Sequence, residues 1–196
     1  MDDITQALDR RTFFVTAAVG TGASLAGCST SGSNEGDGSS STSGTAQGGY
    51  VDGTRLVDGD GNPVGVDAID AGSGGELTVY PEKEGGGALE EKDVTALLVR
   101  FAEDAYVDPT DVDGTIQGYA AYSKVCTHAG CLVSERGGPD GEDFHCPCHG
   151  STFDPRKGAE VVSGPAPRPL PQLPVGLTSD GEFVVATGGF EGAVGP

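Results

Sequence analysis

The chain has 196 residues, and 30 Asp and Glu against 11 Lys and Arg give it a formal net charge of −19 at pH 7. Nucleic acids and anionic lipid headgroups carry charge of the same sign, so this composition excludes them as favoured partners. A surface rich in carboxylates and poor in lysine is also typical of halophile proteins, in which carboxylates retain water and cations.

Residues 1–27 predict an export signal. Arg10 and Arg11 precede Thr-Phe-Phe, a twin-arginine pattern that resembles the address of the route for folded proteins. The apolar stretch 13–27 is short beside the roughly 20 residues that span a bilayer, and it ends Leu-Ala-Gly before Cys28. This ending favours a lipobox, with a lipid on Cys28 that anchors the chain at the extracytoplasmic face of the membrane. The alternative is an uncleaved N-terminal signal anchor.

Residues 28–49 predict a flexible tether. They are almost wholly Ser, Gly, Thr and Ala, with two acidic residues. Such a segment has too little apolar surface to form a core, so it is expected to stay a coil. A domain on this tether could move between two partners.

Residues 50–196 predict one all-β domain. The stretch is rich in glycine, its apolar runs are short, and no segment keeps a 3.6-residue period. Ser-Asp-Gly at 179–181 is a hairpin signal between two such runs. We expect antiparallel sheets stacked as a β-sandwich. The expected strands are 54–57, 77–80, 95–101, 116–123, 173–178 and 182–187.

Two short motifs hold most of the residues that can bind metal. Cys-Thr-His-Ala-Gly-Cys covers 126–131 and Cys-Pro-Cys-His-Gly-Ser covers 146–151, so together they contain four of the five cysteines and two of the three histidines. Two thiolates and two imidazoles could hold a zinc ion. A zinc site of that kind leaves one cysteine in each motif without a role. His145 has no place in the pattern of either motif.

The two motifs resemble those of the Rieske iron–sulfur proteins. The resemblance implies a [2Fe–2S] cluster in which Cys126 and Cys146 bind one iron and His128 and His149 bind the other. It also implies a Rieske-type antiparallel β-sandwich with a small cluster-binding subdomain, here at about 119–171. Neutral imidazoles in place of thiolates remove negative charge, which moves the potential into roughly the −150 to +300 mV range.

The remaining cysteine of each motif separates subfamilies. In Rieske proteins of cytochrome bc-type complexes and of arsenite oxidases, cysteines at the positions of Cys131 and Cys148 form a disulfide. The cytosolic ferredoxins and oxygenases of the family usually lack both. A disulfide implies an oxidising compartment, in agreement with the export signal; the alternative is two reduced thiols packed as small apolar groups. With Cys28 as lipid site, every cysteine has a role.

Three features near the motifs bear on the potential and on docking. Gly-Pro-Ala-Pro at 164–167 resembles the stiff third loop that covers the cluster in bc-type relatives. Ser151 matches the family's serine, which hydrogen-bonds a bridging sulfide, whereas Phe153 replaces the usual tyrosine and cannot donate to a ligand sulfur. Ala129 stands where bc-type relatives often have leucine. The surface that faces the quinol in those relatives therefore carries a smaller apolar side chain here. The basic residues nearby are expected to be solvated side chains: Lys124, Arg136, Arg156, Lys157 and Arg168.

The resemblance implies an electron-transfer subunit and not a stand-alone enzyme. The expected role is to accept an electron from a quinol bound to a cytochrome b-type membrane subunit and to pass it to a further acceptor. By resemblance, His149 accepts the hydrogen bond of the quinol hydroxyl. The alternative is the small Rieske subunit of an arsenite-oxidase-like molybdenum enzyme. A cytosolic ferredoxin for an oxygenase is disfavoured by the export signal and the cysteine pair.

Overall fold

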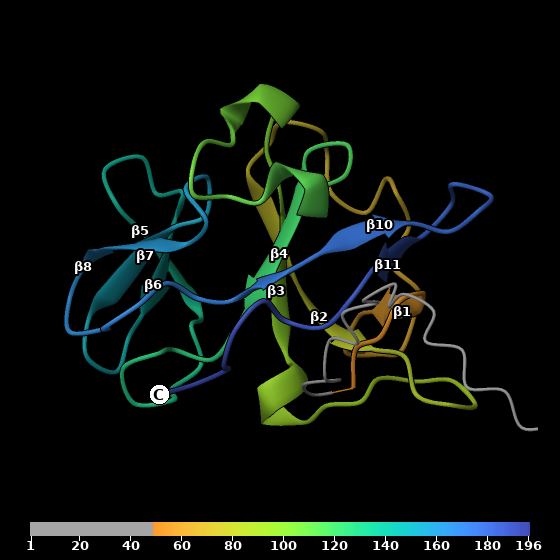
Figure 1. Cartoon of the computed structure of the whole chain (residues 1–196), viewed down its shortest axis with the longest axis horizontal. Coiled ribbons are helices and arrows are strands. Elements are labelled where there is room, and N and C mark those ends of the chain that lie inside the picture. The colour runs from red at the N-terminus through yellow and green to blue at the C-terminus, as the bar shows by residue number, and fades with distance from the viewer. Residues whose placement is uncertain (1–48) are drawn as a thin grey trace, which may run out of the picture. The chain divides into compact units, whose positions relative to one another are not determined.

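The computed structural model describes residues 49–196, which form an all-β unit of two antiparallel sheets (Figure 1). Residues 1–48 lie outside the described part, and with them the predicted twin-arginine signal, Cys28 and nearly all of the tether. Three short 3-10 helices interrupt the loops within 49–196, at Lys92–Val94, Glu103–Ala105 and Val112–Gly114. No helix in this part is long and apolar enough to cross a membrane.

The larger sheet has seven strands in the order β10-β11-β1-β2-β3-β4-β9. Strands β9 and β10 are its two edges, yet only Pro174 separates them in the sequence. The sheet must therefore curl until its edges approach each other. Its strands are β1 (Thr54–Val57), β2 (Gly75–Pro81), β3 (Ala96–Arg100), β4 (Tyr119–Ser123), β9 (Gln172–Leu173), β10 (Val175–Leu177) and β11 (Val184–Ala186).

Strands β3 and β4 are buried on both faces. Side chains alternate between the faces of a strand, so Ala96 and Leu98 enter the core inside the curled sheet. Leu97 and Val99 point the other way, into a second core. This double burial explains why the two strands read as continuous apolar runs.

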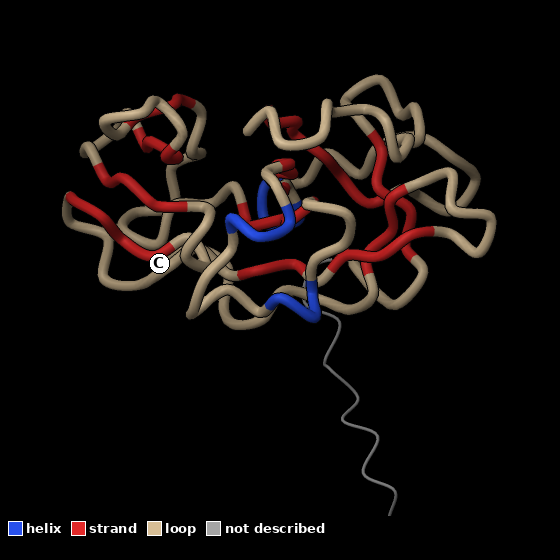
Figure 2. The backbone as a smooth tube through the Cα atoms, turned by 90° about the horizontal axis from the view of Figure 1, so that it is seen from above, coloured by secondary structure: helices blue, strands red, loops and turns tan. Residues whose placement is uncertain are grey.

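The smaller sheet covers the outer face of β3 and β4. It has the order β5-β6-β7-β8 and lies between β4 and β9 in the sequence. Phe144 and Phe153 from this sheet share the second core with Tyr122 of β4, and Figures 1 and 2 both show the four strands as a separate group. Its strands are β5 (Glu135–Gly137), β6 (Asp143–Cys146), β7 (Ser151–Asp154) and β8 (Glu160–Ser163).

The strands expected from the sequence recur, most of them with bounds shifted by one or two residues, and with two larger differences. Strand β4 begins at Tyr119 and not at residue 116, because Ile116 and Tyr119 close a tight turn in which Gln117 and Gly118 have positive φ. The expected strand 173–178 is divided at Pro174, which has no N–H to donate. The hairpin at 179–181 is present, since β10 and β11 pair on either side of it. The all-β antiparallel class is therefore confirmed.

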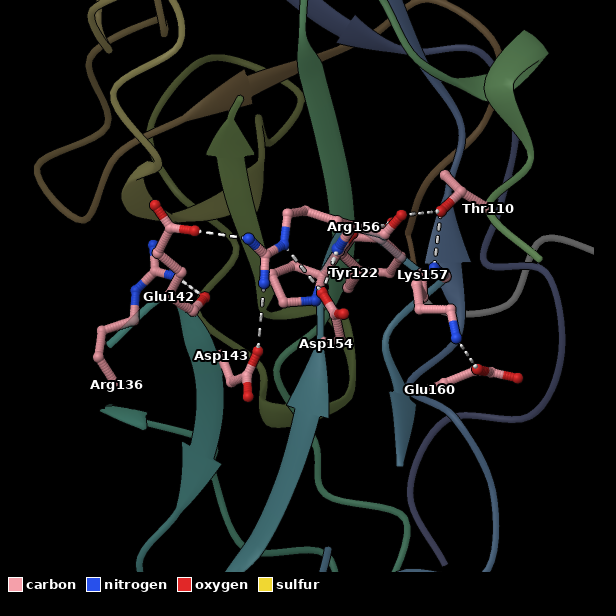
Figure 3. A network of polar contacts seen from close by, with 11 residues as sticks. Thr110, Tyr122, Arg136, Glu142, Asp143, Asp154, Arg156, Lys157 and Glu160 are labelled. Carbon is pink, nitrogen blue, oxygen red and sulfur yellow. Dashed lines mark hydrogen bonds and ion pairs between the residues drawn. The ribbon is translucent and has the colours of Figure 1, made fainter. Parts of the chain in front are cut away.

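Two arginines join the smaller sheet to the larger one. The Nε of Arg136 lies 2.9 Å from an oxygen of Glu76 on β2, and its Nη2 donates to Gly74 O at 2.6 Å. Arg156 lies 5.7 Å from the ring centroid of Phe101. Its guanidinium also contacts three carboxylates of the smaller sheet and its loops, shown in Figure 3: Glu142 at 2.7 Å, Asp154 at 3.2 Å and Asp143 at 3.9 Å. From the sequence, Arg136 and Arg156 were expected to be solvated side chains. The structure shows instead that both form ion pairs with carboxylates.

Candidate functional site

The first motif forms a compact loop directly after β4, which we call the first cysteine loop (126–131). The N–H of Cys126 donates to Cys131 O at 2.8 Å, and the N–H of Gly130 donates to Cys126 O at 2.9 Å. Gly130 has a φ of 73°, a conformation that residues with a Cβ seldom adopt. These bonds place both cysteines at the base of the loop and His128 at its bend.

The second motif is the turn of the β6–β7 hairpin, which we call the second cysteine loop (146–151). Cys146 ends β6 and pairs with Ser151 at the start of β7. The N–H of Gly150 donates to Cys146 O at 3.0 Å, and Gly150 has a φ of 76°. The two cysteine loops therefore have the same construction, with a bond back to a buried cysteine and a glycine that closes the turn.

A disulfide between Cys131 and Cys148 joins the two loops, with 6.5 Å between the Cα atoms. The rings of His128 and His149 then lie side by side, with their centroids 4.6 Å apart and their planes at 88°. The thiols of Cys126 and Cys146 are free and buried. Burial, and then the neighbouring thiol of Cys126, raises the pKa of Cys146. All the ligand candidates of both motifs are thus brought together.

The four side chains differ in exposure. Cys126 and Cys146 are 2% and 1% exposed, while His149 lies at the surface. His128 is partly buried, and its Nδ1 is a buried atom without a hydrogen-bond partner within residues 49–196. Buried polar atoms are normally satisfied. Thiols and imidazoles are the donors that iron and zinc prefer, so the chemistry of the four side chains suits either metal. Within residues 49–196, no three His, Cys, Asp or Glu side chains are grouped closely enough to hold a single ion.

A proline loop (164–168) lies against both cysteine loops. The N–H of Ala166 donates to the Oγ of the buried Ser151 at 3.1 Å, and the hydroxyl of Thr127 donates to Arg168 O at 2.6 Å. A Cβ on Gly164, whose φ is 90°, would lie 2.5 Å from the Cα of Ser151. The loop can approach so closely only with glycine at that position, and its two hydrogen bonds connect it to one cysteine loop each.

The register of β6 and β7 shows on which face of the smaller sheet each remaining candidate site residue lies. Phe153 pairs with Phe144 and Ser151 pairs with Cys146, so these four side chains share the face that carries the buried thiol. His145 lies on the opposite face, where its Nδ1 is 3.1 Å from Thr152 Oγ1. Ala129 is exposed at the bend of the first cysteine loop.

Sequence patterns did not reveal two residues of the site, Thr127 and Arg168. Each acts through a partner that is remote in the sequence, and neither residue type is a metal ligand. The position of Thr127 between Cys126 and His128 was the one available signal. Arg168 was expected to be solvated, but its carbonyl accepts from Thr127 and its guanidinium donates to two other carbonyls.

Comparisons with known proteins identify the domain. Residues 87–174 match a family described as the Rieske [2Fe-2S] domain. A protein of Haloferax mediterranei that is named as the Rieske subunit of a respiratory nitrate reductase is 50% identical over 147 residues, which are 75% of this chain and 62% of that protein. The Rieske iron–sulfur subunit of the cytochrome bc1 complex of Streptomyces lividans is 41% identical over 102 residues, 51% of this chain and 58% of that subunit.

Among solved structures, the soluble domain of Rieske protein II from Sulfolobus acidocaldarius is similar to this chain. It superposes with a TM-score of 0.38 and 27% identity, over 56% of this chain and 70% of that one. This chain spans about three fifths of the length of the two relatives named above, at 62% and 58%. Residues 87–174 thus match the Rieske [2Fe–2S] domain, a domain that carries one [2Fe–2S] cluster.

Proposed function

Starting from this Rieske domain, we propose that Cys126 and Cys146 bind one iron of the cluster and that His128 and His149 bind the other. The donor chemistry fits, because two buried thiols are neighbours and two imidazoles lie side by side. The buried Nδ1 of His128 has no hydrogen-bond partner within residues 49–196, and a metal bound there would satisfy it. When bound, the cluster supplies a one-electron couple. Ser151 is a further cluster contact, since its oxygen accepts from Ala166 and its own proton remains free to donate.

We infer that the protein transfers electrons from a quinol, bound to a cytochrome b-type membrane subunit, to a further acceptor. The observation that carries this function is the exposed imidazole of His149 beside buried thiols. A metal-bound imidazole keeps its second ring nitrogen to accept or release a proton, so His149 can receive the hydrogen bond of a quinol hydroxyl. Leu132, 41% exposed, and the exposed Pro147 give the same tip an apolar surface for docking.

The experiment is to purify the holoprotein and to record its electron paramagnetic resonance spectrum after reduction. We expect the spectrum of a histidine-ligated [2Fe–2S] cluster in the parent and none in His149→Ala. His145→Ala is the matched control, because His145 lies one residue from a ligand but on the opposite face of β6. A cluster retained in His149→Ala, or lost equally in His145→Ala, would contradict the ligand set.

A second candidate function is that of a Rieske subunit in a respiratory nitrate reductase. The relative that carries that name is 50% identical over 75% of this chain. Isolation of the complex distinguishes the two functions. A cytochrome b subunit that copurifies with quinol-oxidising activity supports the first, and a large catalytic reductase subunit that copurifies with nitrate-reducing activity supports the second.

We also propose that residues 1–27 direct export and that a lipid on Cys28 tethers the domain to the extracytoplasmic face of the membrane. The disulfide Cys131–Cys148 supports this proposal, because disulfides persist in oxidising compartments. Mass spectrometry of protein from isolated membranes provides the test. A chain that begins at a lipid-bearing Cys28 is expected, and an unmodified mature N-terminus beyond Cys28 would refute the tether.

A further inference from the structure

The segment Ala193–Pro196 lies against the first cysteine loop. A Cβ on Gly195, which is buried, would be 3.5 Å from Val125 Cγ1. A Cβ on Gly130 would be 3.4 Å from the Cδ of Pro196. The C mark accordingly lies beside the smaller sheet in Figure 1 and in Figure 2. The 193–196 segment therefore covers one side of the loop that contains Cys126 and His128.

One arginine holds this segment in place. The Nη1 of Arg168 donates to Ala193 O at 2.8 Å, and its Nη2 donates to Gly195 O. The backbone carbonyl of the same residue accepts from the hydroxyl of Thr127. Thr127 is 1% exposed and lies between Cys126 and His128. Arg168 thus connects the proline loop, the 193–196 segment and the backbone between two proposed cluster ligands.

The bonding of Arg168 differs from that of the other two arginines near the site. Arg136 and Arg156 form ion pairs with carboxylates, whereas Arg168 forms none within residues 49–196 and donates only to backbone carbonyls there. Residues 114–134 and 161–179 contain neither Asp nor Glu, although the chain has 30 acidic residues. No acidic residue within these two stretches therefore competes for the donors of the guanidinium.

We propose that Arg168 is a positioning residue for the cluster. Its forked guanidinium clamps the 193–196 segment onto the first cysteine loop, and its carbonyl fixes Thr127, so both sides of the loop are held by one side chain and its own backbone. The clamp keeps His128 in one orientation and limits the access of water to the base of the loop. This inference rests on the proposed ligand set.

Three variants distinguish the effect of the two-carbonyl contact of Arg168 from the effect of its positive charge. Arg168→Met removes both the fork and the charge. Arg168→Lys keeps the charge, but a single ammonium does not reproduce the planar two-carbonyl contact. Lys92→Met is the matched control, because Lys92 Nζ lies 3.3 Å from the Cβ position of Gly130, so its charge adjoins the same loop. In the described part of the chain Lys92 holds none of the carbonyls of the 193–196 segment.

The first measurement is amide hydrogen exchange of the purified holoprotein. The N–H groups of Cys126 and Gly130 are hydrogen-bonded in the loop and report its opening. In Arg168→Met and Arg168→Lys we expect the amides of residues 125–131 to exchange at least about ten times faster than in the parent. The reason is that each variant loses charge-assisted hydrogen bonds. Lys92→Met should exchange like the parent. Parent-like exchange in β3 shows that the fold is intact, and if Arg168→Met does not fold, Arg168→Lys decides.

The second measurement is the electron paramagnetic resonance spectrum of the reduced protein. We expect broader lines in both Arg168 variants, because His128 samples more orientations, and parent lines in Lys92→Met. Parent exchange rates together with parent lines in Arg168→Lys would overturn the clamp. A parent protein without any iron–sulfur signal would instead overturn the proposed function, so the two failures are distinguishable.

Discussion

The side chains that share a face with the Cys146 thiol differ in what they can donate. Ser151 keeps a hydroxyl proton while its oxygen accepts from Ala166, whereas Phe153 offers only a ring edge. A donor to a cluster sulfur stabilises the reduced state, which carries more negative charge, and so raises the potential. Position 153 is 0% exposed and belongs to the same core as both free cysteines, so a hydroxyl there would lie in a water-poor environment.

Phe153→Tyr is therefore expected to raise the midpoint potential by several tens of millivolts. A charge-assisted hydrogen bond contributes about 1.5 kcal/mol or more. For a one-electron couple about 59 mV corresponds to tenfold, so about 1.5 kcal/mol is roughly 65 mV. Protein-film voltammetry measures the shift directly.

Ser151→Ala is the companion to this variant and should lower the potential, because it removes the remaining hydroxyl donor on this face. An unchanged or lower potential in Phe153→Tyr, with the cluster intact, would show that the ring at 153 does not face a cluster sulfur. Equal shifts of the same sign in the two variants would also contradict the argument.

At the scale of elements, the disulfide connects two turns that no shared strand pairing holds together. The first cysteine loop follows β4 of the larger sheet, and the second is the β6–β7 hairpin of the smaller one. Only the bond Cys131–Cys148 crosses between the two loops covalently. We therefore propose that this bond clamps the loops at a fixed separation and so keeps the two histidines and the two thiols within reach of the proposed cluster.

Cys131→Ala should accordingly give a labile cluster and not an absent one. The bond closes a sequence separation of 17 residues, and closure of a loop of that size stabilises a fold by about 3 kcal/mol in the chain-entropy model. We expect faster bleaching of the cluster absorbance on mild heating, and reaction of the exposed Cys148 thiol with a maleimide. The clamping role would be contradicted if the cluster of the variant were as stable as that of the parent. It would also be contradicted if both Cys131 and Cys148 were alkylated in the native parent.

The sequence predicted elements well wherever the signal was local. The apolar runs of β1, β2 and β3 and the Ser-Asp-Gly hairpin could be predicted, because alternation and turn chemistry act over a few residues. The strands β5 to β8 of the smaller sheet were not predicted, since each has only three or four residues and alternates weakly. They pair with one another and are buried by packing against the outer face of β3 and β4, a long-range contact that no short window contains.

The same reason divides the site into predicted and unpredicted parts. The spacing of Cys126, His128, Cys146 and His149 is local and distinctive, so the ligand set could be proposed from two hexapeptides. The roles of Arg136 and Arg168 depend on Glu76, Ala193 and other partners that lie 25 or more residues away. From the local sequence alone a charged residue is expected to be solvated, because its partner is identified only once the fold is known.

At the scale of the whole molecule, the charge of −19 has two opposing electrostatic consequences. Exposed carboxylates repel one another over many ångströms, which destabilises the compact state. Ion pairs attract over short distances, 2.9 Å from Arg136 to Glu76 between the two sheets and 2.7 Å from Arg156 to Glu142 within the smaller sheet. Salt weakens both effects, but unequally, because screening acts over a Debye length of about 10 Å at 0.1 M and about 3 Å at 1 M.

We therefore expect the thermal midpoint to rise between 0.1 M and 1 M KCl. Repulsions that act beyond a few ångströms are removed almost completely at 1 M, whereas the partly buried pairs at contact distance are screened much less. Each partly exposed pair contributes only about 0–1 kcal/mol, so its loss does not offset the gain. Circular dichroism of the 49–196 domain at both salt concentrations measures the change. In Arg136→Met the midpoint should be lower at each concentration while the rise with salt persists. A midpoint that falls with salt in the parent, but not in Arg136→Met, would mean that ion pairs between the sheets outweigh the repulsion of the acidic surface.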